Sequence, residues 1–327
     1  LKARQIFDRA FHTIIVGNHI YFGSSVDDQV YCLSAETGEV KWRFFTEGPV
    51  RLAPSYHDGA LYFGSDDGFV YCVDPEDGEL IWKKRPGPRD YRIPGNGRVI
   101  SAWPIRTGLV AQNGKIYGTA GMFPSEGVYL FGLDAKTGEV AWMEKQTDLP
   151  AQGYLLASST RLYVPTGRNN PAICDISNGE RLRVVSGEGG TYALLTGDAL
   201  IFGPGKTGKL GWVEDQDKDQ LASFSGNQMI VTPSMSYLLN DTEISALDRT
   251  RYLDLARKRR ELTSNQSQLY KQLKQLEKQQ TEENADANLD SEIQEVREIL
   301  VQIASALDQL SSQMRQCTPW KTDSEFP

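Results

Sequence analysis

Short apolar segments separated by Gly/Asp-rich turns repeat through the first two-thirds of the chain. The repeat is clearest in residues 20–42 (IYFGSSVDDQVYCLSAETGEVKW), 61–82 (LYFGSDDGFVYCVDPEDGELIW) and 116–142, which end in VYLFGLDAKTGEVAW. The aligned turn glycines are spaced by 40, 60 and 41 residues: Gly38, Gly78, Gly138 and Gly179. Tight-turn pairs such as Asp58-Gly59 and Asn113-Gly114 divide each unit into short strands. Four antiparallel strands in roughly 40 residues are typical of a β-propeller blade, and we count six blades, the last incomplete.

A heptad pattern follows, in a stretch without Gly or Pro between Pro233 and Pro319. Apolar residues alternate in steps of four and three along one segment: Leu289, Ile293, Val296, Leu300, Ile303, Leu307, Leu310 and Met314. Upstream, leucines recur every seven residues at Leu255, Leu262, Leu269 and Leu276. This spacing predicts two antiparallel helices packed as a coiled-coil hairpin, the second about 39 Å long at 1.5 Å per residue.

The hairpin falls inside the last blade. Residues 245–248 (SALD) match the end of a third strand, and Trp320 matches the tryptophan that closes the fourth. Eight residues separate Asp74 from Trp82, but 72 separate Asp248 from Trp320. We therefore expect three parts: blades in residues 1–249, an inserted helical hairpin in 250–316, and a return strand in 317–327.

The repeated pattern VYxLDAxTGExxW resembles the PQQ-like repeat of quinoprotein-like β-propellers, over roughly residues 10–248. That superfamily includes quinoprotein alcohol dehydrogenases and the propeller lipoprotein of the outer-membrane assembly machinery. The run GNGRVISAWPIRTG also resembles bacterial PQQ-like repeat proteins of unassigned function. The resemblance implies a propeller, commonly of eight blades. It also implies an exported, periplasmic protein.

A PQQ enzyme of this superfamily would need a bound calcium, an aspartate base, a tryptophan platform and a vicinal disulfide. No Cys-Cys pair occurs in the chain, and no position matches the calcium ligands or the base. We therefore expect no cofactor and no catalytic residue, with PQQ and calcium as the alternative.

Candidate binding residues cluster at the starts of innermost strands, which line the central channel of a propeller. Arg51, Arg106 and Gln152 align there in blades two, three and four, with Trp103 and Tyr192 expected near the same mouth. Two arginines could bind an anionic ligand or a partner's carboxylate. A solvated rim or an internal salt bridge is the competing interpretation. Structural packing between blades is expected for the tryptophans Trp42, Trp82, Trp142 and Trp320.

Charge and composition exclude several function classes. The net charge of −8 and pI of about 5.1 argue against nucleic-acid binding. Four cysteines without CxxC spacing and three histidines do not support a zinc site. No apolar run is long enough for a transmembrane helix. No signal peptide is visible at the start, which suggests a fragment of a longer chain.

The basic run 257–260 (RKRR) lies on the first expected helix. It could contact nucleic acid or an anionic membrane, but in an acidic protein such a run on a helix is more often a solvated face. The sequence thus predicts a non-enzymatic interaction scaffold that binds a protein partner through the propeller rim or the hairpin. An oxidoreductase completed by residues outside this chain is the alternative.

Overall fold

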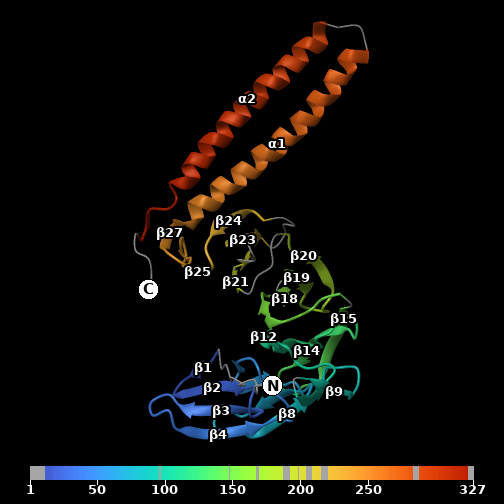
Figure 1. Ribbon diagram of the computed structural model, residues 1–327, viewed down its shortest axis with the longest axis vertical. Helices are drawn as coiled ribbons and strands as arrows, with labels where there is room; N and C mark the ends of the chain where they lie inside the picture. Colours follow the sequence, from blue (N-terminus) through green and yellow to red (C-terminus); the bar gives the residue numbers. More distant parts are fainter. Residues whose placement is uncertain are drawn as a thin grey trace, which may run out of the picture. The chain divides into compact units, whose positions relative to one another are not determined.

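The computed structural model describes residues 12–95, 97–146, 148–166, 169–186, 192–197, 199–203, 208–214, 220–282 and 287–322, without the side chains of residues 169, 192, 282 and 287. It divides into two compact units, Leu1–Gly205 and Lys206–Pro327. Figure 1 shows the sheets and the two long helices. No helix in the described ranges is long and apolar enough to cross a membrane.

Six four-stranded sheets are present among the described residues, and each keeps its strands in sequence order. The first three sheets comprise β1 (Ile14–Val16), β2 (His19–Ser24), β3 (Gln29–Ser34) and β4 (Val40–Phe45); β5 (Ser55–His57), β6 (Ala60–Gly64), β7 (Val70–Val73) and β8 (Leu80–Lys84); and β12 (Val110–Gln112), β13 (Lys115–Ala120), β14 (Val128–Asp134) and β15 (Val140–Gln146). The other three comprise β17 (Leu156–Ala157), β18 (Arg161–Thr166), β19 (Asn169–Asp175) and β20 (Arg181–Val184); β21 (Tyr192–Thr196), β22 (Ala199–Gly203), β23 (Lys209–Glu214) and β24 (Ala222–Ser225); and β25 (Gln228–Val231), β26 (Met235–Leu239), β27 (Ile244–Asp248) and β28 (Trp320–Lys321).

These sheets confirm the predicted β-propeller blades. The described strand pairings within them are antiparallel, and the predicted turns Asp58-Gly59 and Asn113-Gly114 adopt positive φ at both residues. The first strands of successive sheets contact one another, β5 with β12 and β12 with β17. The first strands therefore lie on the side where the blades converge.

The repeated glycine and tryptophan form one contact between neighbouring blades. A Cβ atom on Gly78 would lie 2.7 Å from the Trp42 ring, one on Gly138 2.7 Å from Trp82, and one on Gly179 2.4 Å from Trp142. Each glycine also has a φ between 70° and 79°, which side chains rarely adopt. The turn of one blade thus requires glycine for two reasons. Its backbone has a positive φ, and a side chain would collide with the tryptophan ring of the preceding blade.

The 60-residue step between the second and third blades contains an extra β-hairpin in a Pro/Gly-rich segment. Strands β9 (Arg92–Gly95) and β10 (Arg98–Ser101) pair in antiparallel register. We call residues 92–101 the strap. A second short element, β11 (Thr107–Gly108), pairs in parallel with β16 (Gly153–Tyr154) and joins the inner segments of the third and fourth blades.

The two helices are α1 (Arg249–Glu282) and α2 (Ala287–Arg315), and they lie between β27 and β28. Both strands belong to one sheet, with Ala246 opposite Trp320, so the predicted insertion point is confirmed. The predicted seam of α2 supplies five buried side chains: Ile293, Val296, Leu300, Ile303 and Met314. An ion pair of 2.9 Å joins Arg297 of α2 to Glu277 of α1. The three-part domain division stays a prediction, because compactness divides the chain after Gly205 and groups the helices with the last strands.

Candidate functional site

Two arginines from different blades converge on one buried carboxylate. Arg51 precedes β5, Arg106 precedes β11, and Asp66 lies in the turn between β6 and β7. The Nε of Arg51 donates a 2.8 Å hydrogen bond to Oδ2 of Asp66. The Nε of Arg106 lies 3.0 Å from Oδ1 as an ion pair without hydrogen-bond alignment. We call these three residues the guanidinium site.

Burial controls the electrostatics of this site. The Asp66 side chain is 0% exposed, whereas Arg51 keeps 30% and Arg106 14% exposure. Burial raises the pKa of Asp66, although the guanidinium groups of Arg106 and Arg51 act to lower it. Burial also lowers the pKa of Arg106. Arg51 and Arg106 both pair with the single carboxylate of Asp66. Among the described residues, the three groups of the guanidinium site therefore carry one more positive than negative charge when Asp66 is ionised.

The outer nitrogens of both guanidinium groups stay available. Each arginine contacts Asp66 most closely through Nε, and among the described residues no hydrogen bond is made by an Nη atom of Arg51 or Arg106. A guanidinium group presents up to five N–H donors in a plane that matches carboxylates. The site can therefore accept a carboxylate or another small anion at its exposed, Arg51 side.

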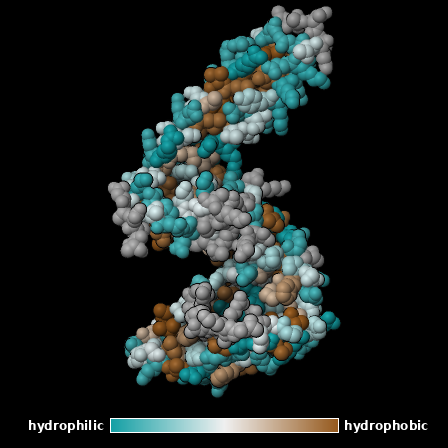
Figure 2. Space-filling model, in the orientation of Figure 1, coloured by the Kyte–Doolittle hydropathy of each residue, from teal (hydrophilic) through white to brown (hydrophobic). Residues whose placement is uncertain are grey.

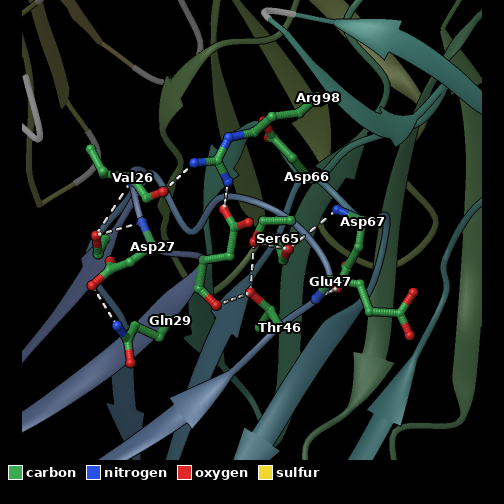
Figure 3. Close-up of polar contacts among 12 residues, drawn as sticks. Val26, Asp27, Gln29, Thr46, Glu47, Ser65, Asp66, Asp67 and Arg98 are labelled. Atoms are coloured by element: carbon green, nitrogen blue, oxygen red, sulfur yellow. Dashed lines mark hydrogen bonds and ion pairs between the residues drawn. The ribbon is translucent and has the colours of Figure 1, made fainter. Parts of the chain in front are cut away.

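The turn that carries Asp66 is held by its neighbour, Asp67. Its carboxylate accepts hydrogen bonds from the backbone N–H groups of Glu47 (3.1 Å) and Phe69 (2.9 Å) and from the hydroxyl of Tyr71 (2.6 Å). Ser65 donates to the Gly48 carbonyl at 2.9 Å. Figure 3 shows Ser65, Asp67 and Glu47 together in this network. With its oxygens bonded to these donors, Asp67 acts as a turn-forming residue.

The strap fastens this turn to the first blade. Arg98 of the strap donates to the Asp28 carboxylate. It also donates to the Val26 carbonyl, as Figure 3 shows. The backbone N–H of Ser101 donates to the Asp66 carbonyl at 2.8 Å. The strap therefore fixes the backbone of the turn that carries Asp66.

The remaining predicted site residues do not join the guanidinium site. Trp103 is 5% exposed, lies in a core cluster with Ala102 and Ile105, and donates its indole N–H to the Glu126 carbonyl at 3.3 Å. Trp103 is therefore a core residue, and its predicted role near a channel mouth stays a prediction. Gln152 is exposed and its backbone N–H donates to the Pro165 carbonyl. The side chain of Tyr192 lies outside the described residues.

The blade tryptophans occupy equivalent register positions. Trp42, Trp82 and Trp142 pair with Cys32, Cys72 and Gly132 on the third strand of their own sheets. Trp42 and Trp82 donate their indole N–H to Pro75 and Ala135 carbonyls of the next blade. Trp320 pairs with Ala246 in the same way but is 48% exposed.

Tyr154 was not singled out by the sequence, yet it connects several blades. Its hydroxyl accepts the Ala53 N–H at 2.9 Å, and its ring lies 4.9 Å from the His12 ring. A Cβ on Gly108 would lie 2.3 Å from this ring. Together with the first strands, Tyr154 lines a hollow of about 480 Å³. The sequence held no local pattern for these contacts, because Tyr154 pairs with Gly108 and bonds to Ala53, which lies 101 residues away in the chain.

The described residues do not fit calcium-bound PQQ. No three His, Cys, Asp or Glu side chains of the described chain gather to hold a metal. The buried carboxylate nearest to this role, Asp66, has both oxygens facing arginines, which would compete with a cation. We derive no chemical step through PQQ from these residues.

Comparisons with known proteins agree with the fold. A sequence model of the family described as "Outer membrane protein assembly factor BamB" matches residues 8–120. The structure is similar to BamB from Moraxella catarrhalis (TM-score 0.51, 14% identity, 71% of this chain and 68% of that one). It is also similar to the quinohemoprotein alcohol dehydrogenase of Comamonas testosteroni (TM-score 0.54, 12% identity, 72% of this chain and 52% of that one). No curated protein matches the chain.

The chain therefore has a β-propeller fold, and the repeats in residues 8–120 are similar to those of the BamB family model. It spans about half the length of the alcohol dehydrogenase that it matches. At these identities the similarity establishes the fold.

Proposed function

We propose that this protein is a non-enzymatic interaction scaffold, with the helical hairpin as its arm for a protein partner. The observation that carries the proposal is the way in which the hairpin is built. It leaves and re-enters the last sheet between two paired strands, β27 and β28, and its own side chains fill its seam. Figure 2 shows apolar surface along the hairpin among hydrophilic side chains, and Val301 (70%) and Tyr270 (56%) are exposed there.

The guanidinium site supplies a second contact point on the propeller. Arg51 is exposed beside a buried counter-ion, so it is held in place and still offers N–H donors. A side-chain or C-terminal carboxylate of the partner fits these donors. The name of the matching family, an outer membrane protein assembly factor, supports a protein partner and a periplasmic location.

A photo-crosslinking amino acid at Val301 tests the arm in cells. We expect one discrete adduct from this position and none from a matched position at Glu36, an exposed residue of a blade turn. Equal adducts from both positions, or none from Val301, would contradict the role of the arm.

The second candidate is a PQQ-dependent or other oxidoreductase, favoured by the fold similarity to quinohemoprotein alcohol dehydrogenases. Its residues would then lie partly outside the described chain. Titration of the full-length protein with PQQ, followed by absorbance with and without calcium, separates the two. Saturable, calcium-dependent binding would replace the scaffold proposal with the enzyme.

A further inference from the structure

A groove at the base of the hairpin has the opposite charge to the protein as a whole. It has a volume of about 560 Å³ and is lined by one face of α1, by the start of β24 and by Met314 of α2. The lining residues on α1 include Arg259 and Arg260, and no Asp or Glu is among the described residues that line it. The full chain carries a net charge of −8, so this basic groove differs from the average surface.

Arg259 is the cation that is free to act in this groove. Its neighbour Arg257 is already paired with Glu214 (2.6 Å) and Asp254 (2.8 Å). In the described part of the chain no carboxylate pairs with Arg259, and its side chain is exposed. Arg259 also lies near Tyr252: burial raises the pKa of the Tyr252 hydroxyl, and the positive charge of Arg259 acts to lower it. The basic run is thus divided between an internal ion pair and a groove-lining cation.

One wall of the groove is an unpaired strand edge. β24 pairs with β23 on one side and ends its sheet. The Gly226 N–H donates to the Gly208 carbonyl, next to β23. In an antiparallel pair every second residue directs its N–H and C=O groups to the partner strand, so those of Ser223 and Ser225 point away from β23. The Tyr252 hydroxyl of α1 contacts the Ser223 carbonyl at 3.5 Å, which places this edge on the groove side.

The helix wall offers acceptors as well as a cation. The Thr263 and Ser267 hydroxyls donate to the carbonyls of Arg259 and Thr263, so their oxygens are left to accept. An ionised phosphodiester brings only acceptors and leaves such oxygens unmatched, whereas a peptide brings a row of N–H donors. The groove runs along α1 from Tyr252 to Ser267, roughly 22 Å at 1.5 Å per residue, which matches about six extended residues.

We propose that this groove binds an extended acidic peptide segment, which adds to the edge of β24 and directs carboxylates toward Arg259. Main-chain hydrogen bonds to Ser223 and Ser225 supply the alignment, and the buried floor of Leu221, Ala222 and Ala256 takes small apolar side chains. Alternating acidic and apolar residues therefore suit it. The inference stands independently of whether the arm carries the proposed protein contact.

Fluorescence anisotropy of a labelled Glu-Val-Glu-Val-Glu-Val peptide with the full chain tests this site. We expect saturable binding that Arg259→Glu weakens about tenfold or more, because a charge reversal opposes the peptide carboxylates. Lys258→Glu makes the same charge change one residue away, at a position that does not line the groove, and should change affinity less than about twofold.

Peptide chemistry distinguishes edge pairing from general attraction. Methylation of alternate peptide N–H groups should abolish binding, and a Lys-Val-Lys-Val-Lys-Val peptide should not bind. Equal weakening by both protein variants, unchanged binding of the methylated peptide, or absence of saturable binding would overturn the proposal. Displacement of the peptide by inorganic phosphate or by phosphatidylglycerol vesicles would also overturn it, and would assign the groove to phosphate groups.

Discussion

Two insertions interrupt the blade repeat, and they are stabilised in opposite ways. The strap, residues 92–101, has four-residue strands and relies on the propeller for its contacts, through Arg98 to Asp28 and Val26 and through Ser101 to Asp66. The hairpin of α1 and α2 brings a buried seam of its own.

This difference separates structural from recognition roles. An insertion that borrows its hydrogen bonds becomes part of the surface that it contacts, and the strap holds the backbone carbonyl of Asp66 through the Ser101 N–H. An insertion with its own core depends less on the blades, and in this hairpin contacts such as Arg257 with Glu214 and Tyr252 with Ser223 tie only the base of α1 to the last strands. We therefore expect substitutions near the strap to affect folding, and substitutions on the hairpin surface to affect binding.

The largest effect is expected at Asp66, under the strap. Asp66→Ala leaves the partly buried Arg51 and Arg106 without their counter-ion and should lower the free energy of unfolding by about 3–5 kcal/mol. Urea denaturation followed by circular dichroism measures this loss. Glu36→Ala, at an exposed turn, is the control and should change stability by less than about 0.5 kcal/mol. A loss at Asp66 no larger than that of the control would show that the guanidinium site does not stabilise the propeller.

A comparable effect is expected at Trp142, which packs on Gly179 of the next blade. Trp142→Ala should destabilise by about 3–5 kcal/mol, because the contact between blades is lost. Trp320 has the same register but is 48% exposed, so Trp320→Ala should cost about 1 kcal/mol or less. An unchanged denaturation midpoint and slope for the Trp142 variant would refute this packing.

A smaller effect is expected at Arg98, the fastening point of the strap. Arg98→Ala removes bonds to one carboxylate and one carbonyl at a partly exposed site and should cost about 1–2 kcal/mol. Hydrogen exchange should accelerate at the Ser101 amide, which donates to Asp66. Lys136→Ala, on an exposed turn, is the control. Unchanged exchange at Ser101 would mean that the strap does not depend on Arg98.

The sequence predicted the parts that repeat. The turn glycines and tryptophans are in phase, and the gap between Asp248 and Trp320 located the hairpin correctly between β27 and β28. Repetition is informative because the same packing requirement recurs in each blade.

The sequence could not predict contacts between distant, non-repeated residues. Asp66 lies 15 residues from Arg51 and 40 from Arg106, and no local pattern links them. The strap was missed because β9 contains Pro94 and Gly95, which disfavour strands. Trp103 was placed near the mouth from its position close to Arg106 in the sequence. That position does not indicate whether the side chain is buried.

The most direct test of the scaffold with a separable arm replaces residues 251–316 by a short Gly/Asn turn. The account predicts that the variant keeps the β-sheet circular dichroism of the propeller, loses the helical signal and loses the partner crosslinked at Val301 in the intact chain. Failure to fold would show that the hairpin is integral to the blades. Folding with full retention of that partner would show that the hairpin is not the recognition element.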